Sequence, residues 1–196
     1  MAARIEERPN RRGRPRSAAA EVAILDATYR LIVSKGLRQV TMDAIARASG
    51  VSKMTIYKWW PSREALLIDA FLRHASLMLP LTEDGDPLAT LRRHAAAYCE
   101  ALKEEFGAVQ LAVISECIAN TGSARLFSER YLGIRRKAAV SIIERGQREG
   151  SITAAIPAGD LYDRIYGTLF YRFLFQFRPL SGDYARKLVD SLLTPH

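Results

Sequence analysis

Apolar residues recur along most of the chain at the spacing of three and four residues that marks an amphipathic helix. The first such stripe, Val22, Leu25, Tyr29 and Ile32, stops at Gly36. Further helices are predicted at about 41–48, 52–59, 62–79, 88–106, 109–119, 124–148, 159–177 and 182–193. Glycines and prolines separate these predicted helices, for example at Gly107 and in the acidic linker 80–87. Without strand alternation or an internal repeat, the pattern predicts an all-α protein of about nine helices.

Two short predicted helices between residues 40 and 61 begin with the same local signal. Thr41 and then Ser52 stand where an N-cap is expected, because their hydroxyls can accept from free backbone N–H groups. Gly50 falls between the helices, where a tight turn requires a left-handed backbone. This arrangement predicts a helix-turn-helix unit. With one face of Trp59, four apolar residues at hydrophobic-staple spacing would fill its inner side: Val40, Ile45, Val51 and Ile56.

The other side chains of the second short helix would point outward. A recognition helix presents such side chains to base edges in the major groove, and the candidates are Lys53, Met54 and Thr55. Donors around this helix suit phosphate oxygens, which fix register without specifying sequence. The predicted contacts of this second kind are Thr41, Tyr57, Lys58, Trp59 and Arg63, and Ser52 completes the predicted DNA-binding set.

The positive charge of the chain is confined to its first third. The net charge of +8 comes from 29 Lys/Arg and 21 Asp/Glu among 196 residues. Residues 1–63 hold 13 basic and 5 acidic residues, whereas residues 64–196 hold 16 of each. This asymmetry indicates a polyanion-binding module joined to a neutral body. Residues 1–17 are predicted to be a disordered basic arm that enters the minor groove or only adds non-specific affinity, with Arg12, Arg14 and Arg16 as its candidate contacts.

The run TMDAIARASGVSKMTIYKWWPSREALL, residues 41–67, resembles the N-terminal domain of TetR-family (tetracycline-repressor-like) transcription regulators. It shares their Thr-x-x-x-Ile-Ala and Gly-Val-Ser patterns, Tyr57, an aromatic residue at 60 and Ser-Arg-Glu-x-Leu. It departs at Trp59, where many members carry His, and at Arg63, where Lys is usual. The resemblance, strongest over about residues 18–70, implies a three-helix DNA-binding domain over 18–63 and a helical effector-binding and dimerisation domain over 64–196.

The predicted C-terminal body is rich in aromatic residues, eight of which fall within 158–184. A helix that is apolar on most sides must be covered on most sides, either by a second copy through residues 159–193 or by the core of a monomer. The resemblance also implies a pocket for a small apolar or amphipathic effector. Its candidate lining residues are Tyr98, Cys99, Phe106, Ile114, Cys117, Phe127, Tyr131, Tyr166 and Phe170, although apolar residues at helical spacing usually only pack in the core. Glu116 could face a cationic ligand or be ion-paired.

Several classes of protein are excluded on this sequence. No apolar run reaches membrane-spanning length, the N-terminus lacks the apolar segment of a secretory signal, and two cysteines make no disulfide framework or metal motif. Hydrolase and phosphate-loop motifs are missing, so we expect a cytoplasmic non-enzyme without a cofactor. The resulting hypothesis is a homodimeric repressor that binds an inverted-repeat operator in double-stranded DNA and is released by its effector. Within the same class, an activator or a regulator without a ligand is an alternative. Other classes are a non-specific or architectural nucleic-acid-binding protein without a ligand and a basic membrane-surface protein.

Overall fold

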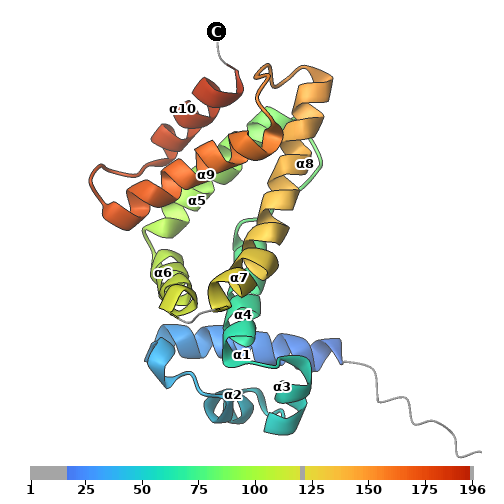
Figure 1. Ribbon diagram of the computed structural model, residues 1–196, viewed down its shortest axis with the longest axis vertical. Coiled ribbons are helices and arrows are strands. Elements are labelled where there is room, and N and C mark those ends of the chain that lie inside the picture. The colour runs from blue at the N-terminus through green and yellow to red at the C-terminus, as the bar shows by residue number, and fades with distance from the viewer. Residues whose placement is uncertain (1–16, 120–121, 195–196) are drawn as a thin grey trace, which may run out of the picture.

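The computed structural model describes residues 17–119 and 122–194, and all regular secondary structure in these two ranges is helical. The all-α prediction is therefore confirmed (Figure 1). The helices are α1 (Ala18–Lys35), η1 (Leu37–Gln39), α2 (Met42–Ser49), α3 (Lys53–Trp59), α4 (Arg63–Met78), α5 (Pro87–Leu102), α6 (Glu105–Ala119), α7 (Ser123–Phe127), η2 (Ser128–Leu132), α8 (Gly133–Glu149), α9 (Ala158–Phe175) and α10 (Gly182–Leu193). None of the helices in these ranges is long and apolar enough to cross a membrane.

The molecule has a small helical unit at one end and a larger helical body at the other. In Figure 1, α1, α2 and α3 lie together at the lower end, and α4 leads from them into the body. Helix α4 packs on α1 and also on α6, and α10 packs on α5 and α9. Helix α4 therefore belongs to both parts and provides the mechanical connection between them.

The first unit folds through the local signals that its sequence carries. Thr41 Oγ1 accepts from the N–H of Ala44 at 3.2 Å, and Ser52 Oγ accepts from the N–H of Thr55 at 3.2 Å, so both predicted N-caps are confirmed. Gly50 has φ 70° and ψ 12°, the left-handed conformation expected at the turn. These contacts orient α3 across α2.

The core of this unit contains the residues predicted to fill its inner side, together with one that the prediction omitted. Val40, Ile45 and Ile56 are completely buried. Trp59 is only partly buried, whereas Trp60 has no exposed surface, and its Nε1–H donates to Asp69 Oδ2 at 2.8 Å. The indole of Trp60 therefore anchors the end of α3 to α4, because a buried indole N–H needs an acceptor.

The predicted helix 88–106 is wrong at its C-terminal end. Helix α5 ends at Leu102, and α6 begins at Glu105, so Gly107 lies inside α6 rather than between two helices. A Cβ at Gly107 would come within 2.0 Å of the carbonyl oxygen of Leu102. Gly107 is needed because α5 and α6 approach each other closely here. Sequence periodicity alone does not distinguish a glycine required by such a close approach from a glycine that ends a helix.

A π-helical turn changes which face of α8 is buried. A continuous helix over the predicted range 124–148 would place Phe127, Tyr131, Ile134, Ala138 and Ile142 on one face. Helices α7 and α8 are joined instead through the π-helix η2, which adds a residue to the turn. As a result Ile134 is 54% exposed, and the buried position passes to its neighbour Arg135, which is 9% exposed.

Candidate DNA-binding surface and ligand cavity

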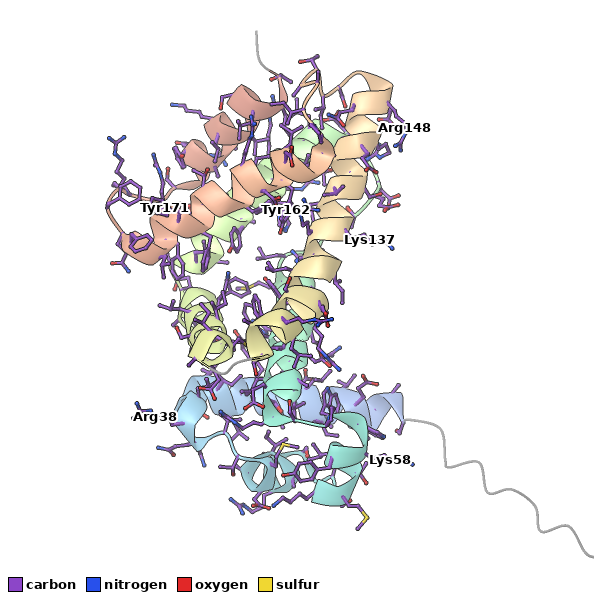
Figure 2. The ribbon with its side chains drawn as sticks, viewed as in Figure 1. Arg38, Lys58, Lys137, Arg148, Tyr162 and Tyr171 are labelled. Atoms are coloured by element: carbon purple, nitrogen blue, oxygen red, sulfur yellow. The ribbon has the colours of Figure 1, made fainter. Side chains whose placement is uncertain are left out.

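Helix α3 presents one polar, solvent-exposed face. Ile56 is completely buried, whereas Met54 is 83% exposed and Tyr57 is 48% exposed. Thr55 is partly buried, and its hydroxyl lies 2.9 Å from Ser52 Oγ. Ser52, Lys53 and Lys58 are also exposed at α3, and Figure 2 shows Lys58 on its outer side. The predicted contact Thr41 is exposed at the N-cap of α2, whereas Trp59 at the end of α3 is partly buried. This arrangement suits insertion of α3 into a groove of a polyanion.

Lys53 is held by an acidic residue of the preceding helix. Its Nζ lies 2.8 Å from Oδ1 and 3.0 Å from Oδ2 of Asp43 in α2. The hydrogen bond lowers the pKa of Asp43 and raises the pKa of Lys53, and both side chains are exposed. The Lys53 ammonium is therefore positioned by Asp43 on the exposed side of α3.

Arg63, predicted to contact phosphate, lies in a different environment. At the start of α4 its Nη1 donates to the carbonyl oxygens of Leu37 (3.2 Å) and Val40 (3.5 Å). Its Nη2 pairs with the carboxylate of Glu116 in α6. The guanidinium therefore joins the helix-turn-helix unit to the body, and Glu116 is ion-paired, which is one of the roles that the sequence left open.

Three further arginines of the helix-turn-helix unit are exposed and were not among the predicted contacts. Arg30 lies on α1, Arg38 on η1 and Arg47 on α2, and Figure 2 shows Arg38 projecting from the edge of this unit. The positive charge of the first third of the sequence was the only signal that pointed to them. The predicted contacts Arg12, Arg14 and Arg16 lie outside the described residues.

The body encloses a cavity of about 430 Å³ between α5, α6, the α7–η2–α8 run and α9. Such a volume is in the range of small-molecule sites. It is lined by most of the predicted pocket residues, namely Tyr98, Ile114, Cys117, Phe127, Tyr131, Tyr166 and Phe170. The other two, Cys99 and Phe106, are buried in the core away from the lining, because α5 and α6 pack their side chains against neighbouring helices.

Five cavity residues with polar side chains were missed by sequence analysis: His94, Gln110, Arg135, Tyr162 and Asp163. Tyr98 and Gln110 pair with each other, with Nε2 donating to the Tyr98 hydroxyl at 2.8 Å. Figure 2 shows Tyr162 on α9, and the guanidinium of Arg136 in α8 lies 5.8 Å from its ring centroid. Only the one-residue shift at η2 turns Arg135 inward, so helical spacing gave no signal for it.

Arg135 and His94 form a buried polar network at the cavity wall. Arg135 Nη2 donates to the carbonyl oxygen of Leu79 at 2.7 Å and lies 2.8 Å from His94 Nε2. His94 Nδ1 lies 2.7 Å from the hydroxyl of Tyr166. Burial, reinforced by the positive charge of Arg135, lowers the pKa of His94 to about 3. His94 is therefore neutral at physiological pH.

Two ion pairs connect residues beside the cavity with the DNA-binding unit. Glu116, next to the cavity residue Cys117, pairs with Arg63. Arg130, next to the cavity residue Tyr131, pairs with Asp69, which also accepts from the Trp60 indole. These contacts link α6 and η2, which border the cavity, to the helix-turn-helix unit.

An apolar surface is exposed at the C-terminal end of α9. Tyr171, Leu174, Phe175 and Phe177 are all at least 40% exposed, and Figure 2 shows Tyr171 on the outer side of α9. We call these four exposed residues the α9 apolar surface. Other apolar residues in the range 159–193, which was expected to form the dimer contact, are less accessible: Phe170 lines the cavity, Phe173 and Leu188 are partly buried, and Leu193 is completely buried.

Both cysteines are free and buried. Burial raises the pKa of Cys99 to about 12 and the pKa of Cys117 to about 11. Because the thiolate is the reactive form, these thiols are suited to packing rather than to redox chemistry.

Two family models match the chain. One, described as bacterial regulatory proteins of the tetR family, matches residues 24–70, and the other, the tetracyclin repressor-like C-terminal domain, matches residues 81–192. The HTH-type transcriptional regulator YdeS of Bacillus subtilis is 34% identical over 180 residues, which cover 92% of this chain and 91% of YdeS.

Solved structures share the same architecture. The structure of the TetR family transcription regulator SCO0332 superimposes with a TM-score of 0.79 at 27% identity, covering 89% of this chain and 96% of that one. FadR of Thermus thermophilus, a TetR family transcriptional repressor solved with lauroyl-CoA, has a TM-score of 0.65 at 19% identity and covers 88% and 93%. The latter likeness concerns the fold alone.

Proposed function

This chain belongs to the TetR family of bacterial regulatory proteins, and we propose that it acts as a homodimeric repressor released from its operator by a small apolar or amphipathic molecule. It is a helix-turn-helix transcriptional regulator that binds DNA, and it is not an enzyme. In this proposal the chain divides near Arg63 into a DNA-binding domain (18–63) and an effector-binding and dimerisation domain (64–196). Such a regulator would act in the cytoplasm, together with the DNA.

The observation that carries the proposal is the exposed face of α3. Ile56 and Trp60 hold this helix in the core, and its outer side chains, Met54 above all, have no packing role. Side chains exposed at the N-terminal end of a recognition helix are those that contact base edges. The proposed contacts are therefore Lys53, Met54 and Thr55 for bases, and Thr41, Ser52, Tyr57, Lys58 and Trp59 for phosphates, with the arm at Arg12, Arg14 and Arg16 adding affinity.

The α9 apolar surface supports a dimer. Exposed aromatic residues at this density are unfavourable in water unless a partner covers them. A second copy related by a twofold axis would cover the same residues on both chains. It would also place two recognition helices about 34–36 Å apart for successive major grooves, so the operator is expected to be an inverted repeat.

The cavity and its connections support release by a ligand. The cavity has the size of a small-molecule site, and the Arg63–Glu116 and Arg130–Asp69 pairs join its surroundings to the DNA-binding unit. A molecule that binds better when α6 or η2 has moved would favour the altered domain arrangement and weaken operator binding. The structural neighbour from Thermus thermophilus combines the same fold with a repressor role and a bound ligand.

The decisive experiment is selection of bound fragments from a random DNA pool, followed by titration of selected and random duplexes at one physiological salt concentration. A specific regulator should bind the selected sequence roughly 10³-fold more tightly or better. The control is Lys137→Met, an exposed position on α8 away from α3 (Figure 2), which should leave the ratio of the two affinities unchanged. Equal affinity for both duplexes would instead identify a non-specific architectural binder and overturn the proposal.

A further inference from the structure

The cavity wall contains a cation that the described residues leave without a carboxylate partner. Arg135 is 9% exposed and lines the cavity. Within the described ranges, no Asp or Glu oxygen lies within 4.0 Å of its guanidinium; only Leu79 O and His94 Nε2 accept from it. Burying an arginine among neutral groups is unfavourable, and this cost falls when an anion occupies the adjoining space.

The hydrogen-bond directions around His94 follow from Arg135. Because a guanidinium has donors and no acceptor, His94 Nε2 must accept from Arg135 Nη2. A neutral imidazole has one donor, so Nδ1 carries the hydrogen and donates to the Tyr166 oxygen. The Tyr166 hydroxyl then has its own hydrogen available for a different acceptor. Tyr166 lines the same cavity, so the wall offers a neutral O–H donor beside the remaining N–H groups of Arg135.

The carboxylate that also lines this cavity belongs to another ion pair. Asp163 Oδ1 accepts from Arg136 Nε and Oδ2 from Arg136 Nη2, both at 3.1 Å. This bidentate pair neutralises Asp163 without involving Arg135. The cavity therefore retains the charge of one guanidinium, which matches one negative charge rather than two.

We propose that the effector is an amphipathic carboxylate, with its head group bound by Arg135 and Tyr166 and its apolar body against Phe127, Tyr131 and Phe170. The inference rests on the proposed function in taking this cavity as the effector site. Because Leu79 O and His94 Nε2 accept both hydrogens of Arg135 Nη2, the Nε and Nη1 donors remain for a ligand. A carboxylate can accept from these donors and balances the single charge of the guanidinium, whereas a phosphate dianion would need a second cation. The three aromatic side chains provide apolar cover for an alkyl or aromatic body. A cationic ligand is disfavoured at this wall.

The test compares head groups on one body. Decanoate, decanol and decylammonium are titrated by calorimetry into the full-length protein without DNA. The unmodified protein should bind decanoate roughly tenfold or more tightly than decanol, because hydrogen bonds to charged groups are stronger, and decylammonium most weakly. Decanol or decylammonium binding as tightly as decanoate would overturn the inference. This comparison needs no variant, so it remains decisive even if substitutions at Arg135 impair folding.

Variants then locate the head group. Arg135→Met removes the cation and keeps the apolar stem, and it should abolish the preference for decanoate over decanol. Arg135→Lys keeps the charge and should retain much of the preference for decanoate over decanol. The matched control is Lys137→Met, an exposed cation on the same helix, which should leave all three affinities unchanged. A carboxylate preference that survives in Arg135→Met would place the head group elsewhere and overturn the assignment.

The result of these ligand titrations can be separated from the test of the proposed function. Operator titration of the same preparation, without added ligand, tests DNA recognition alone. Intact sequence discrimination with no carboxylate preference would refute only the ligand class. Conversely, decanoate bound at Arg135 by a protein without sequence discrimination would refute the proposed function and leave the cavity assignment standing.

Discussion

Removing the guanidinium of Arg63 should weaken the connection between the two parts of the molecule rather than the binding of a phosphate. In the structure this group donates to Leu37 O and Val40 O and pairs with Glu116. The appropriate perturbation is a double-mutant cycle of Arg63→Met and Glu116→Gln. Methionine keeps the apolar stem and glutamine keeps the shape, so each substitution removes mainly the charge.

The expected coupling follows from the burial of the pair. Both side chains are 26% exposed. An exposed pair contributes about 0–1 kcal/mol, whereas breaking a fully buried pair costs about 3–5 kcal/mol, so we expect a coupling free energy of about 1–2 kcal/mol. Glu64 Oε1 lies 3.6 Å from Arg63 Nε as a second acidic neighbour, so Arg63→Met alone should destabilise more than Glu116→Gln alone.

The assay is urea denaturation of the four proteins, together with operator titration at several salt concentrations. If Arg63 connects the domains, the slope of log affinity against log salt is unchanged in both variants; if Arg63 instead binds a phosphate, Arg63→Met should reduce that slope by about 1. The exposed Arg125–Glu129 pair is a matched control and should couple by less than about 0.5 kcal/mol. A cycle at Arg63 that is additive within about 0.5 kcal/mol, or a reduced salt slope, would refute the reasoning.

Four further outcomes are expected. Gly50→Val should lower the free energy of unfolding in urea by about 1–3 kcal/mol, because Gly50 has a φ of 70° and a β-branched residue is strained there. A Cβ at this position meets no neighbouring atom, so the effect is one of backbone conformation, and Gly50→Asn should cost less because Asn tolerates the left-handed region. Equal stabilities of the two variants would contradict a strained turn. Phe175→Asp should give a monomer in sedimentation with reduced operator affinity, whereas Lys137→Asp should remain dimeric; a dimeric Phe175→Asp would move the interface away from the α9 apolar surface. Thr55→Ala should change base preference by about 1–3 kcal/mol at one position of each half-site, and an equal loss on random DNA would remove it from the base contacts. The pKa of His94 falls from 6.5 to about 3 on folding, so the unfolded chain binds this proton more readily than the folded protein. The contribution of His94 to stability is therefore complete above about pH 6.5 and decreases toward pH 3 by up to about 1.4 kcal/mol per pH unit. His94→Gln should reduce this pH dependence in acid denaturation curves.

Most of the DNA-binding unit can be predicted from residue type and spacing. Its caps at Thr41 and Ser52, the left-handed Gly50 and the buried Ile56 are consequences of contacts within a few residues along the chain. Local hydrogen bonds and backbone preferences depend on residue type and spacing, so they can be predicted before any tertiary contact is known. The approximate number and extent of the helices follow for the same reason.

The positions of side chains that do not follow local spacing are determined by how the helices pack. A single extra residue in the turn at η2 exchanges Ile134 for Arg135 at the buried position, and the close approach of α5 to α6 turns Gly107 from an apparent break into a packing requirement. Arg63 meets Glu116 although the two are 53 residues apart in the chain. Helical periodicity contains no information about such distant partners, because burial and ion pairing depend on which helices meet and at what angle.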